Sequence, residues 1–306
     1  MDILFILLGF AALLGGGEFL VRGAVAVAQR FRISPLVIGL TLVGFGTSMP
    51  ELLTSVQAAL AGSPGIAMGN VVGSNIANIL LILGVAAVLA PVAIARSGFL
   101  RDGSVLMAAT VLCAVLVVRG DVGRGAGAVL VLCLVAYLVY ALKTGDADDT
   151  DPPAKAMATA PALLLALGGL ALTLVGAWLL VKGAVSIAAA LGVSEAVIGL
   201  TVVAVGTSLP ELVTSVAAAR KGQGDLAFGN VVGSNIFNIL GILGVTALVK
   251  PLAVPPEIIG FDIWVMLGAT ALLIGFALAG WRVTRGRGAL LLGAYVAYLG
   301  ALLVMA

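Results

Sequence analysis

Apolar runs long enough to cross a lipid bilayer recur along the whole chain, and they leave few folds open to it. A helix needs about 20 predominantly apolar residues to span the hydrocarbon core. Of the 306 residues, 62% are hydrophobic and only 10% are charged. A soluble domain carries roughly 25% charged residues. The sequence therefore predicts an all-α membrane protein embedded in a lipid bilayer.

We expect ten transmembrane helices. The first apolar run, from Ile3, leads into further spans and is not followed by a small-residue cleavage site. It is therefore interpreted as a membrane helix and not as a signal peptide. The expected spans cover residues 3–24, 34–60, 66–90, 103–119, 123–143, 160–183, 194–219, 225–249, 258–280 and 288–305.

The chain also contains one long internal repeat. Residues 34–91 align without a gap to residues 194–251, and 37 of these 58 positions are identical. With five expected helices in each copy, the second copy enters the membrane from the opposite side. Such inverted repeats are typical of secondary transporters, whose substrate site lies near the middle of the membrane between the copies. We expect a first repeat over 1–143, an acidic cytoplasmic linker over 144–158 and a second, inverted repeat over 159–306.

The linker and the charged loops carry further information. Asp146, Asp148, Asp149 and Asp151 could form a calcium-binding loop, but the central glycine and terminal glutamate of an EF-hand are absent. A solvated linker is the favoured interpretation. With ten spans and the N-terminus outside, twelve of the 16 Lys and Arg residues fall on the cytoplasmic side. Cytoplasmic loops carry an excess of such cations, so both termini are expected outside the cell.

The most polar segments of the expected spans are repeated. Residues 46–51 (GTSMPE) and 206–211 (GTSLPE) each lie near the middle of a span. A carboxylate there costs about 2.5–3.5 kcal/mol on insertion scales, so Glu51 and Glu211 indicate a function. Two hydroxyls precede each glutamate by four and three residues and share its helix face. They are Thr47 and Ser48 in the first copy, and Thr207 and Ser208 in the second.

A second pair of motifs follows each glutamate. Residues 69–78 (GNVVGSNIAN) match residues 229–238 (GNVVGSNIFN). In each motif a serine and an asparagine four residues apart share a helix face: Ser74 with Asn78, and Ser234 with Asn238. The other asparagines are interpreted as structural because they are taken to lie off that face; they are Asn70, Asn75, Asn230 and Asn235.

These residue types suit a hard cation. Carboxylates, hydroxyls, amide oxygens and the carbonyls freed by Pro50 and Pro210 are the oxygen ligands that Ca²⁺ takes. Two carboxylates balance one Ca²⁺, two Na⁺ or two protons. An empty cage would bury two unpaired negative charges, so movement across the membrane is easier when the site is loaded. The alternative is that these polar residues only join helices through hydrogen bonds.

The remaining acidic residues of the spans are given other roles. Glu18 is expected to pair with Arg22, four residues further along the same helix. The others fall near span ends and are interpreted as interfacial charges; they are Asp102, Asp225, Glu257 and Asp262.

The paired motifs resemble the signature of the calcium/cation antiporter superfamily, specifically its prokaryotic sodium/calcium exchanger branch. The resemblance covers the whole ten-helix plan. It implies a packed core of four motif helices, across which the first and sixth helices slide. It also implies a ligand set for Ca²⁺ and Na⁺ that adds two backbone carbonyls to the side chains: Glu51, Glu211, Thr47, Thr207, Ser48, Ser208, Ser74, Ser234 and Asn78, with the carbonyls of Gly44 and Ala204.

The chain departs from that pattern at Asn238. Well-described sodium/calcium exchangers, including potassium-dependent ones, resemble it but carry an aspartate there. The amide can still offer an oxygen to a cation, so Asn238 stays in the expected site. However, the loss of a carboxylate argues against co-transport of K⁺.

We therefore expect a secondary active antiporter that exchanges Ca²⁺ for Na⁺ by alternating access in the plasma membrane of a prokaryotic cell. No cofactor, nucleic acid or obligate protein partner is expected. A Ca²⁺/H⁺ antiporter on the same fold is the alternative, because two glutamates can titrate without sodium. A channel and a purely structural membrane protein are further alternatives. An enzyme is disfavoured because the chain has no histidine to act as a base for a serine nucleophile.

Overall fold

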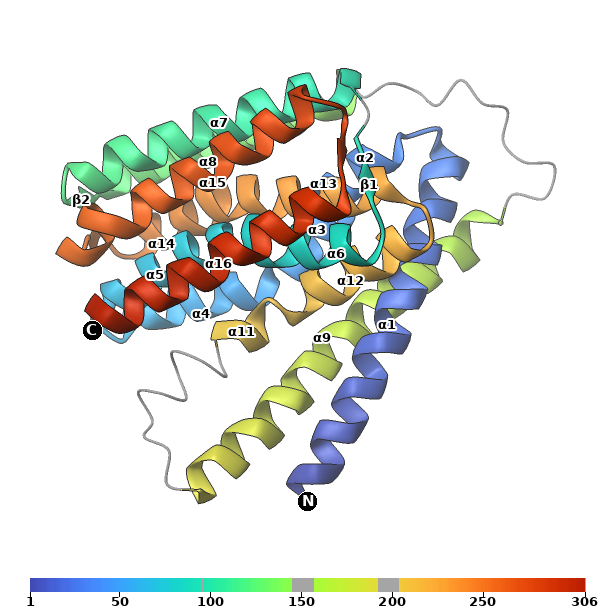
Figure 1. Cartoon of the computed structure of the whole chain (residues 1–306), viewed down its shortest axis with the longest axis horizontal. Coiled ribbons are helices and arrows are strands. Elements are labelled where there is room, and N and C mark those ends of the chain that lie inside the picture. Colours follow the sequence, from blue (N-terminus) through green and yellow to red (C-terminus); the bar gives the residue numbers. More distant parts are fainter. Residues whose placement is uncertain (95, 145–156, 192–203, 306) are drawn as a thin grey trace.

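The protein is almost entirely helical (Figure 1) in a computed structural model that describes residues 1–94, 96–144, 157–191 and 204–305. Among these residues, eight helices are long and apolar enough to cross a membrane. A ninth span is formed if the bent pair Pro35–Thr47 and Met49–Leu60 is counted as one. The expected all-α fold of a multi-spanning membrane protein is confirmed at this level.

The elements follow one another in the same order in both parts of the chain, with π-helical segments labelled η. The first part contains α1 (Asp2–Phe31), α2 (Pro35–Ile38), η1 (Gly39–Val43), α3 (Gly44–Thr47), α4 (Met49–Leu60), α5 (Pro64–Ala77), η2 (Asn78–Ile82), α6 (Leu83–Leu89), β1 (Val92–Ala93), α7 (Arg96–Val118), β2 (Asp121–Val122) and α8 (Arg124–Thr144). The second part contains α9 (Thr159–Ala190), α11 (Ala204–Thr207), α12 (Leu209–Arg220), α13 (Gly224–Ile236), η4 (Phe237–Leu243), α14 (Gly244–Val249), β3 (Leu252–Ala253), η5 (Ile258–Asp262), α15 (Ile263–Leu278), β4 (Arg282–Val283) and α16 (Arg285–Met305).

The expected spans coincide with these helices except in two respects. The span expected over 194–219 begins outside the described residues, and the linker expected over 144–158 lies almost wholly outside them. The span over 34–60 is not straight, because it bends by 44° at Ser48. Pro50 cannot donate a backbone hydrogen bond one turn back, which explains the bend at this point.

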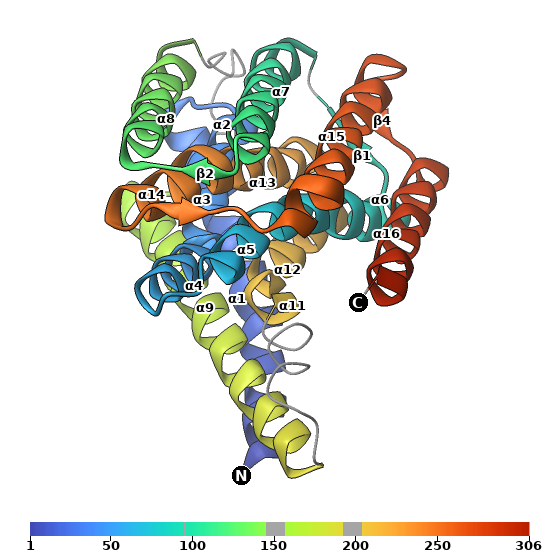
Figure 2. The same ribbon diagram turned by 90° about the vertical axis from the view of Figure 1, so that its left-hand side faces the viewer.

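Helices α1 and α9 pack side by side and extend away from the rest of the bundle (Figures 1 and 2). Glycines every seven residues allow this contact: Gly9, Gly16 and Gly23 on α1. A Cβ atom on Gly16 would lie 2.5 Å from the backbone nitrogen of Thr173 on α9. The two helices therefore meet backbone to backbone, which only glycine permits.

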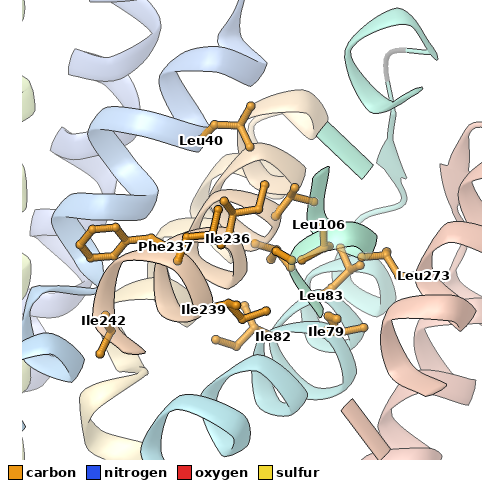
Figure 3. Close-up of a cluster of buried hydrophobic side chains, with 14 of the residues drawn as sticks. Leu40, Ile79, Ile82, Leu83, Leu106, Ile236, Phe237, Ile239, Ile242 and Leu273 are labelled. Atoms are coloured by element: carbon orange, nitrogen blue, oxygen red, sulfur yellow. The ribbon is translucent and has the colours of Figure 1, made fainter. Parts of the chain in front are cut away.

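The core lies where the helices that carry the repeated motifs cross. The span from α5 through α6 is 72% buried, and the span from α13 through α14 is 89% buried, against 11% for the peripheral α16. Figure 3 shows the aliphatic side chains that fill the crossing, with Leu106 of α7 and Leu273 of α15 closing it. The motif helices are thus the most protected part of the fold.

Two short antiparallel strand pairs connect the two parts of the chain. Strand β1 pairs with β4, with Val92 opposite Val283, and β2 pairs with β3, with Val122 opposite Leu252. Before β2 and β4 the backbone takes the left-handed conformation, at Gly120 (φ 88°) and at Trp281 (φ 53°). Each part of the chain therefore contributes one strand to each pair.

Candidate functional site

Both predicted glutamates lie in the first turn of a helix that follows a break. Ser48 (φ −84°, ψ 9°) separates α3 from α4, and Ser208 (φ −90°, ψ 5°) separates α11 from α12. Glu51 and Glu211 are the acidic residues of the first turns that follow. Free backbone N–H groups at a helix N-terminus favour negative charge, so each break provides a suitable position for a carboxylate.

The structure brings the two glutamates into one buried site. The Ser48 hydroxyl donates to Glu211 Oε1 over 2.8 Å, and the Ser208 hydroxyl donates to Glu51 Oε1 over 3.2 Å. Both glutamates are only 2% exposed. Each carboxylate is therefore held by a serine from the other copy of the motif.

Four side-chain oxygens at this level are buried and accept no hydrogen bond. They are Oε2 of Glu51, Oε2 of Glu211, Oδ1 of Asn78 and Oδ1 of Asn238. A buried polar atom without a partner costs about 1–3 kcal/mol, and more when it is charged. Unpaired oxygens from two carboxylates and two amides are the donor set that a hard cation would satisfy.

The other predicted ligands surround this set. The Ser234 hydroxyl donates to the Gly44 carbonyl oxygen over 3.2 Å, and the Thr47 hydroxyl reaches the same oxygen at 3.3 Å. Gly44 allows this approach, because a Cβ atom there would lie 3.1 Å from the Ser234 nitrogen. Thr207 interacts with the Glu51 side chain.

Two further predicted ligands are placed by the helices alone. Ser74 is buried on α5, and Ala204 is the first residue of α11.

The asparagines assigned a structural role do make structural hydrogen bonds. Asn75 donates to the Val71 carbonyl of its own helix over 2.7 Å. Asn235 accepts a hydrogen bond from Asn78 Nδ2 over 3.3 Å, and this leaves the Asn78 oxygen free of partners.

The expectation that Asn70 and Asn230 lie off the ligand face was wrong. Asn70 precedes Ser74 by four residues, so the two share a face with Asn78. Asn70 uses that position to bond the Glu51 carbonyl on the neighbouring helix.

Glu18 makes the predicted ion pair and one that the sequence did not reveal. Arg22 Nε lies 2.7 Å from Glu18 Oε1, as expected for residues four apart on a helix. Lys221 Nζ, at the end of α12, lies 2.5 Å from the same oxygen. Glu18 therefore ties α1 to the bundle.

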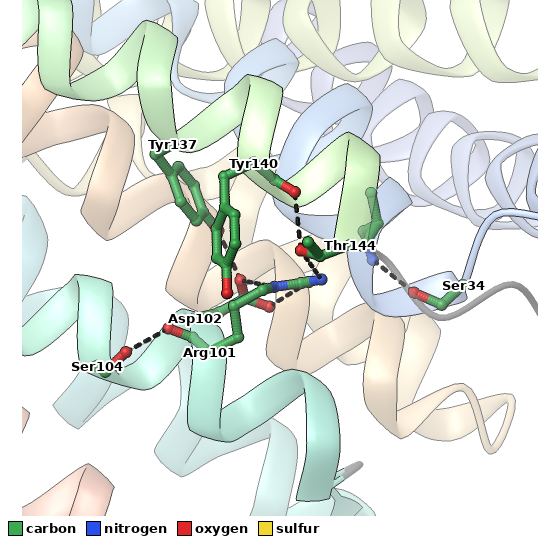
Figure 4. Close-up of polar contacts among 8 residues, drawn as sticks. Ser34, Arg101, Asp102, Ser104, Tyr137, Tyr140 and Thr144 are labelled. Carbon is green, nitrogen blue, oxygen red and sulfur yellow. Dashed lines mark hydrogen bonds and ion pairs between the residues drawn. The ribbon is translucent and has the colours of Figure 1, made fainter.

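The interpretation of Asp102 as an interfacial charge was wrong. Its side chain is fully buried, forms a two-bond ion pair with Arg101 and accepts a hydrogen bond from the Tyr137 hydroxyl over 3.2 Å (Figure 4). Asp262 likewise accepts a hydrogen bond from Tyr298 over 2.8 Å. The separation of 160 residues between these aspartates was the signal, because it equals the repeat distance.

The site contains two carboxylates and otherwise neutral oxygens. Across the described ranges, no three His, Cys, Asp or Glu side chains gather in a way that could hold a metal ion. A cation bound between Glu51 and Glu211 would therefore meet two negative charges at most, and the rest of its shell would come from hydroxyls, amides and carbonyls.

Comparison with known proteins identifies the family. Residues 1–143 and 161–304 match the model of the sodium/calcium exchanger protein family. A putative antiporter, CaxA of Alkalimonas amylolytica, is 39% identical over 96% of both chains. The sodium/calcium exchanger MaX1 of Methanosarcina acetivorans is 34% identical over 98% of this chain and 97% of its own.

The fold is shared with a solved structure. The sodium-calcium exchanger NCX_Mj, soaked with zero Na⁺ and Ca²⁺, matches with a TM-score of 0.89 at 36% identity, over 98% of each chain. The same protein soaked with 100 mM Na⁺ and 10 mM Sr²⁺ also matches with a TM-score of 0.89. By sequence and by fold, the chain belongs to the sodium/calcium exchanger protein family, whose members are membrane transporters and not enzymes.

Proposed function

We propose that the protein is a secondary active antiporter that exchanges Ca²⁺ for Na⁺ across the membrane by alternating access. The observation that carries the proposal is the set of four buried, unpartnered oxygens of Glu51, Glu211, Asn78 and Asn238. They come in equal number from the two motif copies, and no other arrangement of neutral groups would satisfy two carboxylates so well as a cation. The names of MaX1 and NCX_Mj support Na⁺ over protons as the counter-ion.

Twelve residues are proposed to supply the ligands. The two glutamates provide the charge, and the hydroxyls, amides and two carbonyls complete the shell. The set is Glu51, Glu211, Thr47, Thr207, Ser48, Ser208, Ser74, Ser234, Asn78, Asn238, Gly44 and Ala204.

The charge of the site supports exchange over leak. Two ionised carboxylates are balanced by one Ca²⁺ or by two Na⁺, so the two cations compete for the same oxygens. Without a cation, two negative charges would stay buried close together, which is costly. The site therefore moves across the membrane most easily when it is loaded. With Asn238 in place of an aspartate, no third carboxylate supports binding of K⁺.

We also propose that the chain forms two inverted repeats of five helices, residues 1–143 and 159–306, joined by a linker over 144–158. The exchanged strand pairs support this proposal, as do the reciprocal bonds between Ser48 and Glu211 and between Ser208 and Glu51. So does the contact of Thr110 with Thr270, 160 residues apart, at 3.5 Å. Equivalent residues of two copies meet in this way beside a two-fold axis.

The proposed location is the plasma membrane of a prokaryotic cell, with both termini outside. The support is the sequence distribution of cations, twelve of which fall on one side of a ten-span topology. Ca²⁺, Na⁺ and the bilayer are the proposed partners.

Uptake of Ca²⁺ into proteoliposomes under separately imposed gradients tests the function. Vesicles loaded with Na⁺ and diluted into Na⁺-free buffer should accumulate Ca²⁺, whereas a K⁺ gradient of equal size should not drive uptake. A protein that responds to a pH gradient and ignores Na⁺ would be a Ca²⁺/H⁺ antiporter, and the proposal would fail. Unitary currents in a planar bilayer would instead identify a channel.

A further inference from the structure

The face of α5 that carries two of the proposed ligands begins with a residue outside the ligand set. Asn70, Ser74 and Asn78 follow one another at intervals of four residues, so they share one face. The nitrogen of Asn70 donates twice to α4, to the Glu51 carbonyl oxygen at 3.0 Å and to Ser55 Oγ at 2.8 Å.

The second copy repeats the arrangement. Asn230 Nδ2 donates to the Glu211 carbonyl oxygen at 3.2 Å and to Ser215 Oγ at 2.8 Å. Both serines are fully buried. The same two bonds in both copies make a chance contact an unsatisfactory explanation.

The bonds link the two kinds of proposed ligand within each copy. Helix α4 carries the Glu51 carboxylate, and α5 carries the neutral oxygens of Ser74 and Asn78. The carbonyl that Asn70 holds belongs to Glu51 itself, so the backbone of the glutamate is fixed relative to α5. Only the side-chain torsions of Glu51 then remain to set the distance from the carboxylate to the neutral oxygens.

Asparagine suits this task for a chemical reason. Its amide nitrogen has two protons for two acceptors, whereas an ionised aspartate only accepts hydrogen bonds. The amide is also neutral, so it adds no third charge beside the carboxylates. Asn230 makes a further contact, because its Oδ1 lies 3.4 Å from the Thr47 hydroxyl of the other copy.

We propose that Asn70 and Asn230 are positioning residues that set the spacing between the carboxylate and the neutral oxygens, and thereby the size of cation that the site prefers. This inference rests on the cation site proposed above. Ca²⁺ binds oxygens at 2.3–2.6 Å, and Sr²⁺ is the larger ion of the same charge. A site that loses its spacing discriminates less between the two.

The test uses the full-length protein in proteoliposomes. Na⁺-driven Ca²⁺ uptake is measured over a series of Ca²⁺ concentrations, with and without competing Sr²⁺, for the wild type, Asn70→Ala, Ser55→Ala and the double variant. Replacing residues that orient metal ligands typically costs about 10–100-fold in affinity. Asn70→Ala should therefore raise the KM for Ca²⁺ by about 10–100-fold and lower the preference for Ca²⁺ over Sr²⁺. Since Asn70 and Ser55 act together, the double variant should be no worse than Asn70→Ala alone.

Asn75→Ala is the matched control. Asn75 is an equally buried asparagine on the same helix, but its bond stays within that helix. Its KM and Ca²⁺/Sr²⁺ preference should match those of the wild type.

Three results would overturn the inference. They are an unchanged KM and preference in Asn70→Ala, equal losses in Asn75→Ala, and additive effects in the double variant. If Asn70→Ala does not fold, Ser55→Ala alone decides, because it removes one acceptor and keeps the amide. A wild type without Na⁺-driven uptake would instead sink the proposed function, and this inference with it.

Discussion

The Ser48 hydroxyl donates a hydrogen bond to Glu211 Oε1 over 2.8 Å, so a serine of one motif copy holds the glutamate of the other. The reciprocal bond joins Ser208 to Glu51. Because each serine is itself the residue at which a helix breaks, the direction of each carboxylate depends on the backbone of the opposite copy. Neither copy completes the site on its own.

Replacing either glutamate by glutamine should abolish Ca²⁺ exchange. Glu51→Gln or Glu211→Gln preserves the shape of the side chain but removes one of the two charges that balance Ca²⁺. Uptake in proteoliposomes should fall to background, while size-exclusion elution in detergent stays that of the wild type. Near-normal transport by either variant would show that the site is assigned to the wrong residues.

Removing the reciprocal hydroxyls should weaken binding without abolishing it. Ser48→Ala leaves Glu211 Oε1 without its donor, which should cost about 1–3 kcal/mol of Ca²⁺ binding free energy. Calorimetric titration of the detergent-purified protein measures the change. Ser104→Ala is a suitable control, because that hydroxyl bonds only the Arg101 carbonyl at an exposed position. Equal affinities in the two variants would contradict the role of Ser48.

Introducing a third carboxylate should change the cation dependence. Asn238→Asp adds a negative charge at a position whose oxygen is buried and unpartnered. Na⁺ should bind more tightly, or Ca²⁺ uptake should become dependent on K⁺. Uptake measured with Na⁺ and K⁺ varied independently distinguishes these results. An unaltered dependence on both ions would show that position 238 does not set selectivity.

The ion pair between Glu18 and Lys221 should favour one orientation of the transporter. The residues 160 positions away, Trp178 and Ala61, cannot form an equivalent pair. Since the two orientations of an inverted-repeat transporter exchange the roles of its copies, a contact in one copy alone stabilises one of them. The pair is partly exposed, so its contribution is about 0.2–1 kcal/mol.

Removing that pair should therefore shift the apparent Ca²⁺ affinities at the two membrane faces by up to about fivefold. Glu18→Gln is compared with Arg22→Gln, which leaves the Lys221 bond in place. Uptake in right-side-out and inverted vesicles gives the two affinities. If Arg22→Gln has the larger effect, the link from α1 to α12 is not the relevant one.

Two neighbouring glycines should respond in opposite ways to the same substitution. In Gly16→Ala the new Cβ would lie 2.5 Å from Thr173, so α1 and α9 must separate. In Gly15→Ala the nearest atom is Leu172 Cδ2 at 4.0 Å, and alanine favours the helix by about 1 kcal/mol. Thermal unfolding in detergent should show a lower Tm for Gly16→Ala only. Equal values would mean that the helices do not pack as closely as described.

The parts of the fold that the sequence predicts well are those with a local or repeated signal. Apolar length locates the spans, and the near-identity of the two motifs is enough to expect that Glu51 and Glu211 meet. The break at Ser48 follows from Pro50, a local cause.

The parts that escape prediction depend on tertiary neighbours. Lys221 lies 203 residues from Glu18, and nothing near either residue indicates the other. Asp102 was misassigned because its position near a span end suggests exposure, whereas Tyr137 and Arg101 bury and satisfy it. The structural role of Asn70 was expected, but its partners on α4 depend on how two helices dock.

The exchanged strands have a consequence for how the chain holds together. Because β1 pairs with β4 and β2 with β3, the polypeptide before residue 145 is hydrogen-bonded to the polypeptide after residue 156 at two separate places, besides the contacts within the bilayer. A protease cut between those residues should therefore leave two fragments that purify as one particle, and the halves could be synthesised as separate chains and still assemble.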